Sequence, residues 1–222
     1  MSTFQRARSE DQREARRQVI LQTAATMLEE MPVSAVSLNE LSRRVGLAKS
    51  NVLRYFDSRE AVLLDLLIQL AEEFFTQIGK QLPHVVKADA SIRARAGGVA
   101  TALASEIAAN PMLCELLSVQ AGVLEHNVSA ETVAKYKRDG YASLAGFTAA
   151  LRQALPELSE EDAAEATRTI TLLAGALWTH AHPPQAVQDA YAADPSLIFL
   201  PAGFASSLER TISIVLMGLL AD

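Results

Sequence analysis

The 222-residue chain contains a single cysteine, Cys114. One cysteine excludes a disulfide within the chain and is typical of a reducing compartment, so we expect a cytoplasmic protein in which Cys114 packs in the core. Glycine and proline are scarce, at 10 and 8 residues. Runs of β-branched residues are nearly absent, which disfavours β-sheets and predicts an all-α fold.

Long apolar runs and catalytic motifs are missing as well. The longest apolar candidate, residues 212–220, falls short of the ~18 residues that cross a membrane, and the polar segment 2–17 lacks the apolar core of a signal peptide. The sequence has no phosphate-binding loop, dinucleotide-binding glycine pattern, zinc-protease motif or nucleophile elbow. We therefore expect no membrane span, no catalytic residues and no cofactor.

Two neighbouring histidines are the candidate metal ligands. His180 and His182 are separated by one residue, which on a helix places their side chains about 200° apart. They cannot share one face of a helix, although a helix that ended between them would let them converge with a third ligand. A histidine at a helix end beside a loop histidine is the simpler interpretation, so we predict no metal site.

Charge is distributed unevenly along the chain. The net charge is −6, yet residues 1–60 carry 10 Lys+Arg against 8 Asp+Glu, while residues 61–222 carry 10 against 18. The N-terminal part is thus weakly basic, at +2, and the rest is acidic, at −8. This asymmetry favours contact with a polyanion at the N-terminal end only.

The stretch SLNELSRRVGLAKSNVLRYF, residues 37–56, predicts two short helices joined by a tight turn. Ser37 and Glu40 fit a capping box, in which the Ser oxygen accepts the Glu40 N–H and the Glu40 carboxylate reaches back to the Ser37 N–H. Leu38, Leu41 and Val45 recur at helical spacing. Gly46 follows where a helix end favours a residue that adopts positive φ.

The second short helix is predicted over residues 48–56. One side is apolar, and the other carries side chains of the types that read base edges or hold phosphates. They are Lys49, Ser50, Asn51, Arg54 and Tyr55. A helix, a glycine-containing turn and a polar, basic second helix make the helix-turn-helix pattern.

The motifs VGLAK, residues 45–49, and RYFDSREAVL, residues 54–63, resemble the N-terminal domain of the TetR (tetracycline repressor) family. The resemblance covers residues 13–67. Ala48 stands where the family usually has a capping Ser or Thr, and Leu53 stands where a Tyr is common. The resemblance implies about nine helices, with a DNA-binding domain over residues 10–60 and a helical effector-binding and dimerisation domain over residues 61–222.

The boundaries of the other helices follow from apolar periodicity, caps and prolines. Helices are predicted over residues 10–30, 57–82, 90–109, 112–124, 130–154, 160–181 and 202–220. Residues 183–200 hold three prolines and predict a long loop with short helical turns. Residues 1–9 are predicted to be a disordered tail.

The resemblance implies a ligand-responsive transcriptional repressor that binds a palindromic double-stranded DNA operator as a homodimer. We expect Ser37, Lys49, Tyr55 and Arg59 to hold phosphates and Ser50, Asn51 and Arg54 to lie nearest the bases. The alternative is a helical small-molecule-binding or protein-interaction module without specific DNA binding.

The resemblance also implies an apolar cavity for a small hydrophobic effector whose binding releases the DNA. Each candidate lining residue can equally be plain core. The candidates are Met112, Tyr141, Phe147, Trp178, Thr179 and His180. Dimerisation is expected through the last two long helices, by a stripe that includes Ala174 and a stripe that includes Ile212, with packing inside one protomer as the alternative.

Overall fold

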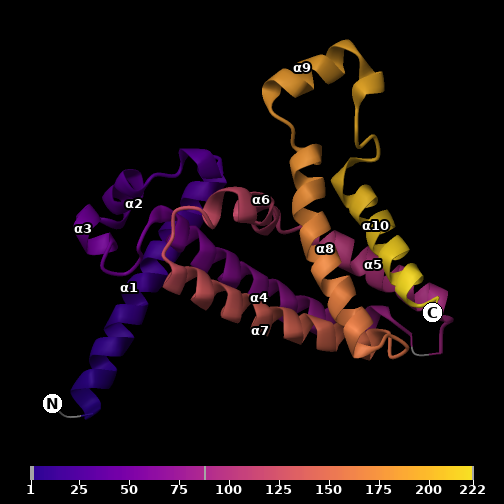
Figure 1. Cartoon of the computed structure of the whole chain (residues 1–222), viewed down its shortest axis with the longest axis horizontal. Coiled ribbons are helices and arrows are strands. Elements are labelled where there is room, and N and C mark those ends of the chain that lie inside the picture. Colours follow the sequence, from indigo (N-terminus) through magenta and orange to yellow (C-terminus); the bar gives the residue numbers. More distant parts are fainter. Residues whose placement is uncertain (1–2, 88, 222) are drawn as a thin grey trace. The chain divides into compact units, whose positions relative to one another are not determined.

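The computed structural model describes residues 3–87 and 89–221, and within these ranges the chain forms ten α-helices and no strand (Figure 1). The all-α class is therefore confirmed. The chain divides into two compact units. Unit 1 comprises the residues up to Gln69 together with Gln120–Lys137, and unit 2 comprises Leu70–Val119 and the residues from Arg138 onward. Two long helices, α4 (Arg59–Val85) and α7 (Ala130–Ala154), each contribute residues to both units.

Unit 1 contains the helix-turn-helix. It is built from α1 (Thr3–Glu30), α2 (Leu38–Val45), α3 (Lys49–Val52) and the first turns of α4. Apolar side chains from each helix meet in one core, which fixes the short helices on the long ones. Its most buried members include Ile20, Ala24, Met27, Leu41, Val52, Leu63 and Leu64.

Three boundaries in this region differ from the sequence expectation. Helix α1 begins at Thr3, so most of the expected N-terminal tail is helical; residues 1 and 2 lie outside the described part. Helix α3 ends at Val52 and continues as a turn, in which the Arg54 and Tyr55 N–H groups bond carbonyls three residues back. Helix α4 runs through Pro83 to Val85, since a proline in the last turn removes only one backbone bond near the helix end.

Unit 2 packs helices in pairs. Helix α5 (Ile92–Ala108) lies against α10 (Gly203–Leu219), and α8 (Glu160–Ala181) lies against both α10 and α6 (Pro111–Val119). The backbones of α6 and α8 approach closely at Gly175, where an added Cβ would lie 3.0 Å from the Leu117 carbonyl. Ala174 on α8 and Ile212 on α10 are buried inside the packed helices of unit 2, and each is 1% exposed.

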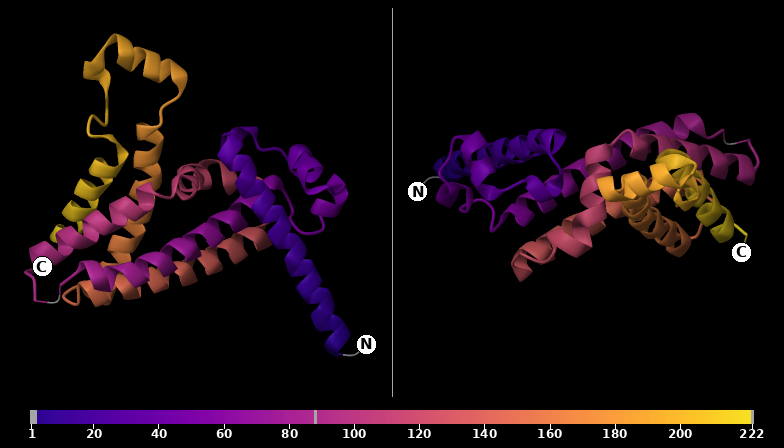
Figure 2. Two further views of the ribbon diagram at one scale, coloured as in Figure 1. Left: turned by 180° about the vertical axis from the view of Figure 1, so that it is seen from behind. Right: turned by 90° about the horizontal axis from the view of Figure 1, so that it is seen from above.

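The segment between α8 and α10 belongs to unit 2 and projects from the packed helices of that unit. It holds α9 (Gln185–Ala193) and a 3₁₀ turn, Pro195–Leu197, which agrees with the expected loop with helical turns. Helix α9 buries no residue and stands beyond the ends of α8 and α10 (Figures 1 and 2). Leu197 and Phe199 are exposed on this segment.

In residues 3–87 and 89–221, no single helix is long and apolar enough to cross a bilayer. The pair Ile92–Ala108 and Pro111–Leu124 meets the length and composition criteria only when taken together, across an 86° bend.

Candidate nucleic-acid interface and apolar cavity

The turn between α2 and α3 forms as the sequence predicts at two of its three signals. Ser37 Oγ accepts the Glu40 N–H at 3.2 Å, and Gly46 adopts the left-handed conformation with φ of 73°. The third signal fails, because the Glu40 carboxylate accepts bonds from Arg43 and Arg44 at 2.6–2.9 Å in place of the Ser37 N–H. The hydrogen bonds from Arg43, and after them the one from Arg44, lower the pKa of Glu40 from 4.5 to about 2.

The polar side of α3 lies at the surface. We call α3 and the turn that follows it, residues 49–55, the recognition segment. Val52 is fully buried beneath it. Its outward side chains are those the sequence singled out: Lys49, Ser50, Asn51 and Arg54 are exposed, and Tyr55 is half-buried. Leu53 is 43% exposed and so contributes little to holding the segment in place.

Arg59 makes hydrogen bonds within the fold. Its Nη1 donates to the Val36 carbonyl at 2.7 Å, and its Nε donates to Glu60 at 2.8 Å. The guanidinium therefore connects the segment before α2 to the start of α4. Its expected contact with a phosphate stays a prediction.

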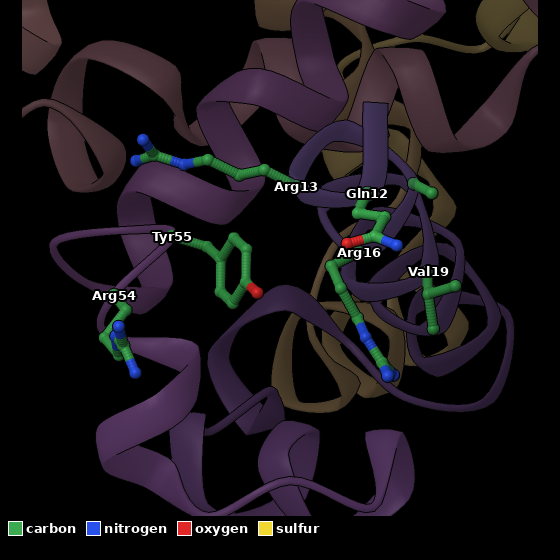
Figure 3. Close-up of a pocket in the computed structure, with 7 residues that line it drawn as sticks. Gln12, Arg13, Arg16, Val19, Arg54 and Tyr55 are labelled. Carbon is green, nitrogen blue, oxygen red and sulfur yellow. The ribbon is translucent and has the colours of Figure 1, made fainter. Parts of the chain in front are cut away.

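An open concavity of about 880 Å³ adjoins the recognition segment (Figure 3). Its lining residues come from α1 and from the end of the recognition segment. They are Gln12, Arg13, Ala15, Arg16, Val19, Arg54 and Tyr55. The Tyr55 ring points into the space between α1 and Arg54 (Figure 3). Three arginines and no acidic residue line this space, which suits an anion.

Arg13 and Arg16 were not among the sequence candidates. The signal that could have found them is their spacing of three residues, which places both on one face of α1. Within the described residues, Arg13, Arg16 and Arg54 make no ion pair. Their charges are therefore available to a ligand.

Arg17, next along α1, points into the fold. Its Nη1 donates to the Tyr55 carbonyl at 2.8 Å, its other terminal nitrogen bonds the Asp65 carboxylate, and its guanidinium lies 4.4 Å from the Phe56 ring centroid. One side chain thus connects α1, the end of the recognition segment and α4.

Unit 2 encloses a small apolar cavity of about 40 Å³. Its lining comes from α4, α5, α6, α7 and α8. The lining residues are Ala71, Phe74, Phe75, Ile107, Leu113, Leu117, Phe147, Ile170, Thr171 and Ala174. The Phe75 and Phe147 rings stack at 5.0 Å between centroids. Thr171 supplies the only polar side chain, so the cavity offers neither charge nor a set of convergent hydrogen-bond donors.

Of the six residues expected to hold an effector, Phe147 lies at this cavity and the other five lie elsewhere. Met112 is half-buried on α6, and Tyr141 is 67% exposed over a groove between α7 and α8. Trp178 Nε1 donates to Glu115 at 2.9 Å while its ring stacks on His182 at 3.7 Å. Thr179 and His180 are exposed. Phe74 and Phe75 also line this cavity and were not among the sequence candidates.

Cys114 is buried and its Sγ donates to the Ile107 carbonyl at 3.3 Å. Burial raises the pKa of the Cys114 thiol from 9.0 to about 12. A thiol in this environment is a core residue, as expected, and has no thiolate character at neutral pH. Across the described part of the chain, no three His, Cys, Asp or Glu side chains gather closely enough to hold a metal ion.

Family models match nearly the whole chain. Residues 20–66 match the model described as bacterial regulatory proteins, tetR family, and residues 69–222 match the tetracyclin repressor-like C-terminal domain. The nucleoid occlusion factor SlmA of Marinomonas sp. is 29% identical over 106 residues, which are 48% of this chain and 52% of that protein. The HTH-type transcriptional regulator EthR of Mycobacterium tuberculosis is 37% identical over 54 residues, which are 24% and 25% of the two chains. The chain thus spans about half or less of the curated relatives it matches.

Solved structures share the fold over almost their full length. A possible TetR family transcriptional regulator from Streptomyces coelicolor superposes with a TM-score of 0.58 at 19% identity and covers 92% of this chain and 98% of its own. A TetR transcriptional regulator from Rhodococcus sp. RHA1 gives a TM-score of 0.56 at 16% identity over 93% and 97%.

Proposed function

Since the chain belongs to the TetR family of bacterial regulatory proteins, we propose that it is a homodimeric, ligand-responsive, sequence-specific DNA-binding repressor that acts in the cytoplasm. The observation that carries this proposal is the exposed polar face of the recognition segment beside a concavity lined by three arginines and no acidic residue. A helix-turn-helix places its second helix in the major groove, and basic side chains beside that helix can hold the flanking phosphates.

The recognition segment would enter the major groove. In that pose Ser50, Asn51 and Arg54 face base edges, and arginine reads guanine through two parallel hydrogen bonds. The phosphates of the flanking backbone would be held by residues on both sides of the segment. These are Ser37, Lys49 and Tyr55 together with Arg13 and Arg16 of the concavity.

We place the dimer contact on the outward faces of α8 and α10. The sequence stripes were expected to meet a second copy at Ala174 and Ile212, but both side chains are 1% exposed because they pack inside the protomer. Leu172 on α8 and Ile214 on α10 are 74% and 61% exposed. A second copy would bury these side chains, and in such a dimer the two readers would have to occupy half-sites ~34–36 Å apart.

The effector we propose is a small, neutral, hydrophobic molecule held at the apolar cavity of unit 2. The lining offers aromatic and aliphatic surface and a single hydroxyl, at Thr171. A phosphorylated or multiply charged metabolite would lose its hydration there without gaining a partner. Binding would favour a dimer in which the two readers no longer match one DNA turn, and so would release the operator.

An electrophoretic mobility shift tests this function against the alternative of a helical binding module without specific DNA recognition. The probe is duplex DNA selected from a random library by the protein itself, with scrambled duplex as competitor. We expect a specific complex that Arg54→Ala weakens by ~1–3 kcal/mol and that Lys49→Ala weakens on all sequences alike. Failure of the wild-type protein to enrich any sequence would overturn the proposal.

A further inference from the structure

The first turn of α7 is hydrogen-bonded to Asp57, which lies two residues beyond the end of the recognition segment. Ser129 caps α7, since its Oγ accepts the Thr132 N–H at 3.2 Å. The hydroxyls of Ser129 and Thr132 each lie 2.6 Å from Asp57 Oδ2 and donate to it. The Asp57 carboxylate therefore completes the N-terminal turn of α7, where a negative charge is favourable.

A second route leads from the same end of α7 to the recognition segment. Lys135 Nζ lies 3.3 Å from Asp65 Oδ1 on α4. The other oxygen of Asp65 accepts from Arg17, which in turn holds the Tyr55 carbonyl. All of these residues belong to unit 1. This second route reaches the recognition segment at the Tyr55 carbonyl, whereas the first reaches the chain just beyond the segment, at Asp57.

The recognition segment depends on such contacts for its orientation. Helix α3 has four residues and lacks a side-chain cap. A single uncapped turn is unstable by itself, because nucleation of a helix costs more than one turn of hydrogen bonds returns. The segment is therefore held in place by the buried side chains of Val52 and Phe56 and by the contacts that Asp57 makes.

We propose that Ser129 and Thr132 are positioning residues for DNA recognition: they hold Asp57, and through Asp57 they set the placement of Arg54 and Tyr55 in the groove. This inference rests on the proposed DNA-binding function. Neither hydroxyl has to touch DNA. The hydrogen bonds join positions 72 and 75 residues apart in the chain, so the sequence near the recognition segment does not contain this part of the reader.

The proposal gives α7 a regulatory role. The helix is continuous from Ala130 to Ala154, and Phe147 on it lines the apolar cavity. A ligand that displaced Phe147 along the axis of α7 would therefore also act on Ser129 and Thr132, and through them on Asp57. This route is additional to α4, on which Phe74 and Phe75 line the same cavity.

The test compares Asp57→Ala with the double variant Ser129→Ala/Thr132→Val on duplex DNA selected by the wild-type protein. Affinity and its salt dependence are measured by fluorescence anisotropy, with the active fraction fixed by stoichiometric titration. We expect each change to weaken binding about tenfold with an unchanged salt slope, since no Lys or Arg contact to a phosphate is lost. Removal of the Asp57 charge alone would strengthen binding to a polyanion, so a loss in Asp57→Ala runs against the electrostatic effect.

Three controls define the positioning role. The combined triple variant should bind no more weakly than either parent, because both parents break the same contact. Ser129→Thr/Thr132→Ser keeps both hydroxyls and should bind within twofold of wild type. Ser143→Ala/Thr148→Val removes the same chemical groups from α7 away from Asp57 and should leave DNA binding unchanged.

The outcomes separate this inference from the proposed function. If the wild-type protein selects no DNA, the proposed function fails. If it binds DNA and the Asp57 and Ser129/Thr132 variants bind equally well, the positioning role alone is overturned. A loss of affinity in the Ser129/Thr132 variant that Asp57→Ala does not share would make the hydroxyls DNA contacts. A loss that vanishes after correction for active fraction would reduce them to fold stability. Either result refutes the proposal.

Discussion

Replacement of Arg13 and Arg16 by alanine should reduce the salt dependence of DNA binding more than any change in the recognition segment. If Arg13, Arg16 and Lys49 each hold one phosphate, a dimer makes about six such contacts and log K falls with log salt at a slope of about −5. The double variant keeps two of them, with a slope of about −2. Between 50 and 200 mM salt the wild type should lose roughly 10³ in affinity and the variant roughly tenfold.

Anisotropy titrations at four or more salt concentrations measure these slopes, on selected and on scrambled duplex. The loss at low salt should be equal for both DNAs, because phosphate contacts carry no sequence information. Arg152→Ala is the matched control, since Arg152 lies on α7 in unit 2 and pairs with Glu160 at 3.9 Å. A double variant with the wild-type slope would show that DNA does not enter the concavity beside α1, and the assignment of Arg13 and Arg16 would be withdrawn.

Three further predictions concern the rest of the molecule. Ile214→Glu should give a folded monomer by light scattering and circular dichroism. Ile212→Glu should lower the free energy of unfolding of the protomer by several kcal/mol, because an unpaired charge replaces a fully buried side chain. A dimeric Ile214→Glu protein would contradict the proposed interface. Cys114 in the native protein should react with a thiol reagent about 10³-fold more slowly than in denaturant, since its pKa is about 12 in place of 9.0; rapid native labelling would show that the site opens. The lowered pKa of Glu40 stabilises the fold above its ordinary value of 4.5, and this contribution is lost as pH falls through about 2. Thermal melts across that range should therefore decline more steeply for wild type than for Glu40→Gln, and parallel curves would argue against the contribution.

The features that the sequence predicted correctly are those set by neighbouring residues. Ser37 caps α2 and Gly46 ends it with positive φ, because a cap and a left-handed turn need only the local chain. The same holds for Ser159, whose Oγ accepts the Asp162 N–H at the start of α8. The bounds of α7 and α8 agree with the sequence for this reason.

The features that the sequence missed depend on contacts between distant residues. Arg59 Nη1 donates to the Val36 carbonyl, 23 residues away, and the motif around Arg59 does not reveal this bond. Ala174 and Ile212 look like interface positions by spacing, but helix periodicity cannot tell whether an apolar stripe faces a second copy or the same chain. Only the packing of α8 against α10 shows that Ala174 and Ile212 are buried inside the protomer. The side chains of Leu172 and Ile214 on the same helices stay exposed.

The size of the apolar cavity constrains how an effector could act. A volume of about 40 Å³ holds little more than a water molecule, while ligand pockets for drug-sized molecules are roughly 300 Å³ or larger. A hydrophobic effector therefore has to displace the stacked Phe75 and Phe147 rings, which stand on α4 and α7. A close-packed core transmits such a displacement as strain to the helices that carry the rings. Entry of the ligand would then be coupled to displacement of α4 and α7, and its free energy would come from the difference in ligand affinity between the two arrangements. Since α4 and α7 both continue into the unit that holds Asp57 and Asp65, the smallness of the resting cavity is what would make the protein responsive to a ligand.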